Sequence, residues 1–248
     1  MLIHNERGRY KFLPGIDPYS CGTIADGSHE IVHATFLDQP QWEEGFARAD
    51  SYLQDAGLDR FALCGVELRC PHPYPMDGFI EFNNGYCELL RSWGLHVEGK
   101  NPIARTNVAP AHDPPSVTTM HGFSFVSPSS TDHTTFLISG AGELRRGDLD
   151  EAQIVRVGDI SAEAMVEKAS FVQGIMEQRM GDLGGSWTEV TTVDVYTIHL
   201  LDQTLSQVVL RGMGRASRHG FRWYCSRPPV VDIEFEMDIR GVRQEVYL

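Results

Sequence analysis

Apolar side chains recur every three or four residues in four stretches of the chain, and this spacing predicts amphipathic α-helices. The four stretches are residues 41–57, 76–94, 161–185 and 201–217. The first stretch carries acidic residues between its apolar positions and ends in a glycine, which is typical of a surface helix and its stop signal.

Short runs rich in β-branched and aromatic residues separate these helices and predict β-strands. The runs cover residues 60–69, 101–110, 186–200 and 223–241, and two prolines interrupt the last one. An arginine, Arg105 or Arg227, stands inside the strand that closes each half of the series. The order helix, strand, helix, strand with an arginine therefore occurs twice.

The residues before each first helix repeat as well, which extends the internal repeat to nearly the whole chain. Residues 17–36 and 121–144 both begin with an aromatic residue and a serine, followed by a turn and a strand of alternating character. We therefore predict two copies of one α+β unit, residues 1–115 and 116–248, joined by the stretch 109–120. Each unit is expected to be a sheet with two helices packed on one face.

The composition limits the functions that such a fold could serve. The formal net charge of −13 opposes binding to nucleic acid, and no stripe of lysines and arginines offsets it. No apolar run reaches the roughly 18 residues of a membrane span. Residues 1–12 lack the basic start and the apolar block of a secretory signal. We therefore expect a cytoplasmic protein with neither a membrane nor a nucleic-acid partner.

The sequence offers no pattern for a metal or a cofactor. Its 5 cysteines include no CxxC pair, which argues against a disulfide framework and against a thiolate zinc site. The histidines form neither HExxH nor HxH, and the short glycine runs at 140–142 and 212–214 do not make a dinucleotide loop. We expect reduced thiols, no bound metal and no cofactor.

Short motifs occur in the same order in both halves. The first half contains "PYS" at 18–20, the FxxxNxxY spacing of Phe79, Asn83 and Tyr86, and "PIARTNV" at 102–108. The second half contains "FLISGAG" at 136–142, "VTTVDVY" at 190–196 and "SRPPVVDIEFEM" at 226–237. Taken in this order, the motifs resemble the RidA/YjgF family of imine and enamine deaminases.

The resemblance implies a chorismate-mutase-like fold in each unit, with a mixed or antiparallel sheet, and a homotrimer whose sites lie in clefts between units. In that family an arginine holds a substrate carboxylate, which implies this role for Arg105 and Arg227. A glutamate of the last strand helps to hold the attacking water, and by position it corresponds to Glu234. The family's pocket-lining backbone and its aromatic wall correspond to Ser139, Gly140, Ala141, and Tyr19 or Phe123.

Two departures from the family pattern make the two clefts unequal. No acid-bearing strand is predicted after Arg105, because the connecting stretch begins there. After Arg227 the loop to Glu234 is short and begins with two prolines. The two clefts are therefore not equivalent, and the sequence leaves open which of them is catalytic.

The chemistry of an imine acid explains why these residue types matter. Hydrolysis needs a cation for a carboxylate, a positioned water and proton transfer to nitrogen; a guanidinium fork suits the first task and a buried carboxyl the others. For each arginine the alternative is an ion pair that fixes a subunit contact. Glu234 is the first choice of carboxylate, ahead of Glu236, Asp194 and Glu67. Strand alternation puts Glu234, Glu236 and Asp238 on one face, which is either a site or a solvated face.

The tandem length and residues 226–242 resemble the 2-aminomuconate and 2-amino-5-chloromuconate deaminases of aromatic-compound degradation. This resemblance implies a cofactor-free hydrolase that releases ammonia from an enamine or imine dicarboxylate, with 2-aminomuconate or a chlorinated analogue as the substrate. Two alternatives remain open. One is a chorismatase-like hydrolase acting on an enol ether acid, and the other is a non-catalytic protein that binds a small acid.

Overall fold

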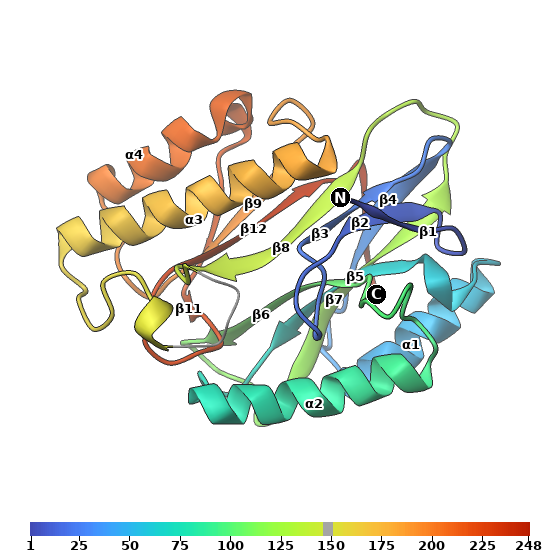
Figure 1. The fold of residues 1–248 in the computed structure, drawn as a ribbon, viewed down its shortest axis with the longest axis horizontal. Helices are drawn as coiled ribbons and strands as arrows, with labels where there is room; N and C mark the ends of the chain where they lie inside the picture. Colours follow the sequence, from blue (N-terminus) through green and yellow to red (C-terminus); the bar gives the residue numbers. More distant parts are fainter. Residues whose placement is uncertain (146–150) are drawn as a thin grey trace.

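The computed structural model describes residues 1–145 and 151–248 as two mixed β-sheets stacked face to face, with helices on the outer face of each sheet (Figure 1). The α-helices are α1 Trp42–Asp55, α2 Met76–Ser92, α3 Ala162–Leu183 and α4 Gln203–Gly212. Short 3-10 helices cover Arg60–Ala62, Glu151–Gln153 and Gly214–His219. The strands are β1 Ile3–Asn5, β2 Tyr10–Leu13, β3 Gly22–Ala25, β4 His29–Thr35, β5 Leu63–Arg69, β6 Ala104–Pro110, β7 Thr119–Pro128, β8 Phe136–Gly142, β9 Thr192–Tyr196, β10 Arg222–Tyr224, β11 Ser226–Arg227, β12 Glu236–Gly241 and β13 Gln244–Tyr247.

The helices lie where the apolar spacing predicts them, and local chemistry sets their ends. α3 begins after Ser161, whose side chain accepts a hydrogen bond from the backbone of Ala164, and it ends at Gly184 with a φ of 85°. Glycine adopts that conformation without a steric penalty. α4 is shorter than the predicted 201–217, because Gly214 has a positive φ and a 3-10 helix follows. No helix of the described chain is long and apolar enough to cross a bilayer.

The first sheet has the strand order β11-β6-β5-β7-β4-β13, and α1 and α2 cover its outer face (Figure 1). Its core joins apolar side chains of both helices to those of the strands, including Phe46, Leu53, Tyr86, Leu90, Leu68 and Phe123. The second sheet has the order β1-β2-β3-β8-β12-β9-β10 and carries α3 and α4. Methionines of α3 lie in its core, which includes Met165, Met176, Met180, Val195, Phe235 and Ile239.

The pairing of the central strands repeats and confirms the tandem α+β fold. β5 pairs parallel with β6 and antiparallel with β7, which in turn pairs antiparallel with β4. β9 pairs in the same way with β10 and β12, and β12 pairs antiparallel with β8. Because the two sets have the same pairing directions and the same helix positions, each is one copy of the repeated unit.

The two sheets exchange strands at both ends of the chain. β1, β2 and β3 join the second sheet through β8, whereas β11 and β13 join the first sheet through β6 and β4. β7 lies on the far side of the predicted boundary at residue 115 but belongs to the first sheet. The division into 1–115 and 116–248 stays a prediction about the repeated units, because the sheets themselves combine strands from both.

One strand prediction needs correction. The run 223–241 is not one strand: β10, β11 and β12 lie in it, and β11 pairs with β6 of the other sheet. Pro228 and Pro229 lack the N–H that a continuing ladder needs, and Asp232 turns the chain with a φ of 70°. The connecting stretch 109–120 leads into β7, which begins at Thr119 and pairs with β5 and β4 of the first sheet.

Candidate active site

A cavity of about 390 Å³ lies where the ends of the two sheets meet. Its wall combines β6 of the first sheet, β8 and β12 of the second, α3, and the loop before β3. The side chains and backbone that line it include Tyr19, Cys21, Phe79, Arg105, Asn107, Gly140, Ala141, Gly142, Ile175, Arg179, Val230, Ile233 and Glu236. The cavity is therefore shared between the two repeated units of a single chain.

Arg105 is a fixed and buried cation in this wall, with 4% of its surface exposed. Its Nη2 donates to Asn83 Oδ1 at 2.7 Å, while Nη1 is buried without a hydrogen-bond partner among the described residues. No carboxylate of the described chain lies within 4 Å of it, and aromatic rings at 4.6–5.9 Å surround the guanidinium: Tyr86, Tyr19, Phe79 and Phe82. A buried guanidinium with a free donor and no acidic partner can bind an anion from solution.

Glu236 is the carboxyl that shares the cavity with Arg105. It opens β12 opposite Gly142 and Tyr196, and 5% of its surface is exposed. Burial raises its pKa well above the usual range, and the nearby carboxyls of Asp238 and Glu143 raise it further, whereas Arg105 and Arg179 lower it in part. Burial and the neighbouring acids therefore favour the protonated form of this side chain, which can donate a proton into the cavity.

The glycine at position 140 makes room for this carboxyl. A Cβ on Gly140 would lie 2.2 Å from Glu236 Oε1 and 3.1 Å from the Thr106 methyl group. The Gly140 amide donates to Thr106 Oγ1 at 3.1 Å, which ties β8 to β6 at the cavity wall. Gly140 and Ala141 therefore line the cavity with their backbone, and their role in substrate binding stays a prediction.

Ser139 joins the strands behind the wall and does not line the cavity. Its hydroxyl donates to the Ser20 carbonyl and accepts a hydrogen bond from the Arg105 amide at 3.1 Å. Tyr19, in contrast, lies in the wall with its ring 5.1 Å from the Arg105 guanidinium, and burial raises its pKa. Ser139 and Tyr19 therefore fix Arg105 from its backbone and its side chain respectively.

Besides Ser139, three predicted site residues lie outside this wall. Glu234 precedes β12, and its Oε2 lies 2.7 Å from His199 Nε2 and 3.9 Å from Arg227 Nη1. The Arg227 side chain is 46% exposed on the edge strand β11. Phe123 is fully buried beneath α1, where its ring contacts Tyr52 among other aromatic side chains. The structure thus separates the predicted pair Arg227 and Glu234 from the cavity that holds Arg105.

Asn107 and Arg179 line the cavity but were absent from the sequence-based candidates. The Asn107 amide is buried and has no hydrogen-bond partner among the described residues. Strand alternation could have revealed it, since Asn107 stands two positions after Arg105 and shares its face. Arg179 of α3 reaches the cavity, and its Nη1 donates to the Ser139 carbonyl at 3.1 Å. No sequence signal singles out Arg179, because a charged helix position is usually solvated.

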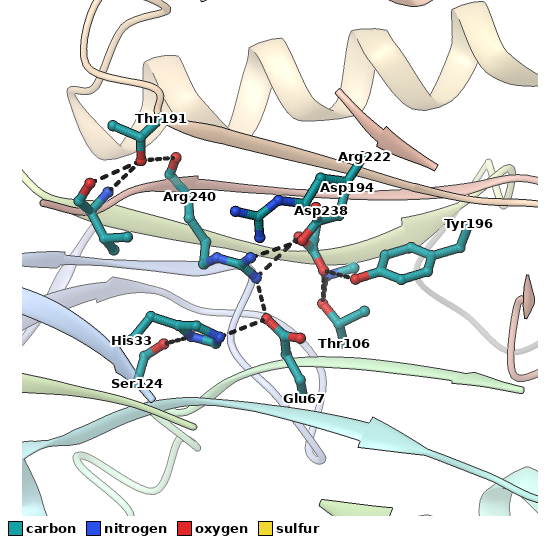
Figure 2. Close-up of polar contacts among 12 residues, drawn as sticks. His33, Glu67, Thr106, Ser124, Thr191, Asp194, Tyr196, Arg222, Asp238 and Arg240 are labelled. Carbon is teal, nitrogen blue, oxygen red and sulfur yellow. Dashed lines mark hydrogen bonds and ion pairs between the residues drawn. The ribbon is translucent and has the colours of Figure 1, made fainter. Parts of the chain in front are cut away.

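A buried charged cluster joins the inner faces of the sheets next to this cavity (Figure 2). Arg240 of β12 contacts the Glu67 carboxylate of β5, and its Nη2 lies 2.9 Å from Asp194 Oδ2. Burial acts to raise the pKa of Glu67, but Arg240, His33 and Arg69 together outweigh this effect and hold the pKa below its usual range. Asp238 accepts hydrogen bonds from Thr106 at 2.7 Å and Tyr196 at 2.9 Å, and burial raises its pKa to about 8.

This cluster explains the placement of Glu67 and Asp194, which stand at matching positions of β5 and β9. Ligand oxygens of Glu67, Asp194 and Asp238 lie within 4.8 Å of one another, a grouping that could hold a cation. The Arg240 guanidinium already supplies a positive charge among them. The cluster therefore cross-links the sheets, and through Thr106 it reaches the cavity wall at Gly140.

Comparison with known proteins adds a family context to this geometry. The family model described as 2-aminomuconate deaminase CnbZ matches residues 2–246. The 2-amino-5-chloromuconate deaminase of Comamonas testosteroni is 35% identical, over 97% of this chain and 96% of that protein. Among solved structures, a chorismatase aligns over 97% of this chain and 79% of its own at 13% identity and a TM-score of 0.47. The YjgF gene product of E. coli aligns over 44% and 81%, at 14% identity and a TM-score of 0.31.

Proposed function

The chain belongs to the 2-aminomuconate deaminase family, and from this premise we propose that it hydrolyses 2-aminomuconate or a chlorinated analogue and releases ammonia. One observation carries the proposal at the level of the site. The buried Arg105 cation, which lacks an acidic partner in the described chain, faces the same cavity as the buried carboxyl of Glu236, whose protonated form burial favours. A carboxylate-binding cation and a proton donor are the two groups that this reaction needs.

Arg105 binds the carboxylate next to the carbon that carries the amine. Its free Nη1 supplies one hydrogen bond, and the Asn83 contact on Nη2 keeps the guanidinium in place. The surrounding rings hold the cation without neutralising it, and the unpartnered Asn107 amide offers further hydrogen bonds to a polar substrate. Such an arrangement fixes the reacting carbon relative to Glu236.

Glu236 performs the proton transfers. It first donates its proton to C3 of the enamine, so that the nitrogen lone pair forms the C=N bond of a cationic imine at C2. A water oxygen then bonds to C2, the C=N electron pair returns to nitrogen, and the ionised Glu236 takes a proton from the water. Glu236 passes that proton to nitrogen, the C–N bond breaks and ammonia leaves. The hydroxyl proton returns to Glu236 as the ketone forms, so the carboxyl ends protonated as it began.

The direct test is turnover of enzymatically generated 2-aminomuconate, followed by the loss of its ultraviolet absorbance and by ammonia release above the spontaneous rate. We expect Glu236→Gln to lower kcat/KM by roughly 10²- to 10⁴-fold, the usual contribution of a general acid. Arg105→Lys, which keeps the charge but loses the fork, should also lower it.

The sequence provides a matched control for each of these variants. Glu234→Gln makes the same change as Glu236→Gln two residues earlier in the chain, and Arg227→Lys makes the same change as Arg105→Lys on β11. Both control residues lie outside the cavity. Their kcat/KM should stay within about threefold of the wild type. The assignment would be contradicted if the folded control variants lost kcat/KM while the Glu236 and Arg105 variants kept it. Turnover of an enol ether acid, or binding without any turnover, would favour one of the two alternatives instead.

The assembly and setting of the protein belong to the same proposal. We propose a cofactor-independent hydrolase that acts in aromatic-compound degradation in the cytoplasm; the five unpaired cysteines support a reducing compartment. We also propose a homotrimer, supported by the tandem units with exposed edge strands β10, β11 and β13. Light scattering that gives a monomeric mass would contradict the trimer but not the assignment of Arg105 and Glu236, since both residues line a cavity within one chain.

A further inference from the structure

Arg179 is a second cation in the cavity, and it approaches from a different element than Arg105. It is half-buried on α3, and its Nη1 donates to the Ser139 carbonyl at 3.1 Å. No hydrogen bond in the described part of the chain engages its Nε or Nη2, and no carboxylate there lies within 4 Å of it. One contact therefore holds the guanidinium while the remaining donors stay free.

The sheet topology explains how a helix residue reaches this position. The pairing of β3 with β8 reaches Gly22 and Ile138, and the Ser139 amide adds one hydrogen bond to the Cys21 carbonyl, so β8 continues from Gly140 to Gly142 without that neighbour. α3 packs across β8 on the outer face of the sheet (Figure 1). The Arg179 side chain follows the open edge of β8, bonds to the Ser139 carbonyl and enters the cavity.

Arg179 and Arg105 influence the same side chains of the cavity. Both lower the pKa of Glu236 and of Tyr19 against the opposing effect of burial, so both guanidinium groups lie near these side chains. Arg105 lies on β6 of the first sheet and Arg179 on α3, which covers the second sheet, and both line one cavity. A monocarboxylate can neutralise only one of them, whereas a dicarboxylate can engage both.

We propose that Arg179 binds the second carboxylate of the substrate, the one remote from the imine carbon, and thereby makes the site selective for dicarboxylic acids. This inference rests on the proposed function, in which Arg105 holds the carboxylate beside the reacting carbon. Arg145 also lines the cavity, but its side chain is exposed and makes no hydrogen bond among the described residues, so it is less fixed than Arg179. Selectivity is therefore assigned to the arginine that the Ser139 carbonyl holds in place.

Two stable probes isolate the second carboxylate. Muconate and sorbate share a six-carbon diene chain and one carboxylate, and only muconate has a carboxylate at the other end. Dissociation constants for both are measured by calorimetry with the wild type, Arg179→Gln and Arg179→Lys. The matched control is Arg211→Gln, on the exposed surface of the neighbouring helix α4. Circular dichroism and thermal unfolding confirm that each variant is folded.

We expect Arg179→Gln to weaken muconate binding by roughly 10- to 150-fold, the range of a charge-assisted hydrogen bond, and to leave sorbate binding unchanged. Arg179→Lys should lose less, and Arg211→Gln should match the wild type. Equal weakening of both probes, or of neither, overturns the inference. A wild type that binds no muconate but still turns over 2-aminomuconate also overturns it. Arg179-dependent muconate binding without any turnover supports Arg179 and contradicts the proposed function instead.

Discussion

Replacing Gly140 by alanine tests whether the cavity is built around the Glu236 carboxyl. The new Cβ would lie 2.2 Å from Glu236 Oε1, and Thr106 atoms at 3.1 and 3.2 Å block the nearby space. Relief of the overlap requires the carboxyl oxygen to retreat by about 1 Å, since nonbonded atoms rest near 3.5 Å and tolerate little compression. A misplacement of this size at a reacting group can lower the rate by roughly 100-fold.

The assay compares kcat/KM for 2-aminomuconate with the melting temperature of each variant. Gly174→Ala is the control, because a Cβ at that exposed position of α3 meets no atom within 4 Å. It should leave kcat/KM unchanged and stabilise the helix by about 0.5–1 kcal/mol. If Gly140→Ala is folded and keeps more than about a third of the wild-type kcat/KM, the contact between residue 140 and Glu236 does not set the catalytic geometry.

Three further substitutions test the surroundings of the cavity. Lys168→Met leaves the fully buried Glu143 carboxyl without the ammonium group 3.0 Å away, and we expect urea unfolding to show a loss of about 3–5 kcal/mol; a loss under about 1 kcal/mol would contradict this. Because the pKa of Asp238 is raised to about 8, its contribution to stability is complete below about pH 4 and is lost as pH rises through about 8. Asp238→Asn should therefore flatten the fall of the unfolding free energy between pH 5 and 8, and parallel curves for the two proteins would refute this reading. Phe123→Ala should cost about 3–5 kcal/mol of stability with kcat/KM of the folded protein unchanged, since its ring lies in the core; a selective loss of kcat/KM would return it to the site.

The helices, the internal repeat and Arg105 are accessible from the sequence because each depends on local information. Helical spacing and end signals such as Ser161 and Gly184 act within a few residues, and α3 begins and ends where they stand. The motif around Arg105 is contiguous on one strand, so its order alone indicates a buried arginine with a special role. The same reasoning predicts that Gly140 and Ala141 approach the cavity as backbone.

The choice between Glu234 and Glu236 depends on where β12 begins, and no local pattern fixes that point. Both residues alternate onto one face, so periodicity ranks them equally. The buried Glu143 carboxylate accepts hydrogen bonds from the backbone of Glu234 and Phe235, at 2.7 and 3.0 Å, and this anchors the chain just before the strand. Glu236 becomes the first ladder residue and enters the cavity, while Glu234 turns towards His199.

By itself the sequence determined the units of the fold: four helices, several of the strands, their repetition, and two strand arginines, Arg105 and Arg227. Tertiary structure alone decided which residues meet Arg105. Arg179 lies on a helix over the second sheet, and β11 crosses to the first sheet after residues that read as one strand. Helix and strand patterns arise from neighbours a few positions apart, whereas the cavity joins side chains more than 100 positions apart, Tyr19 and Glu236 among them, and such contacts exist only once the sheets have stacked.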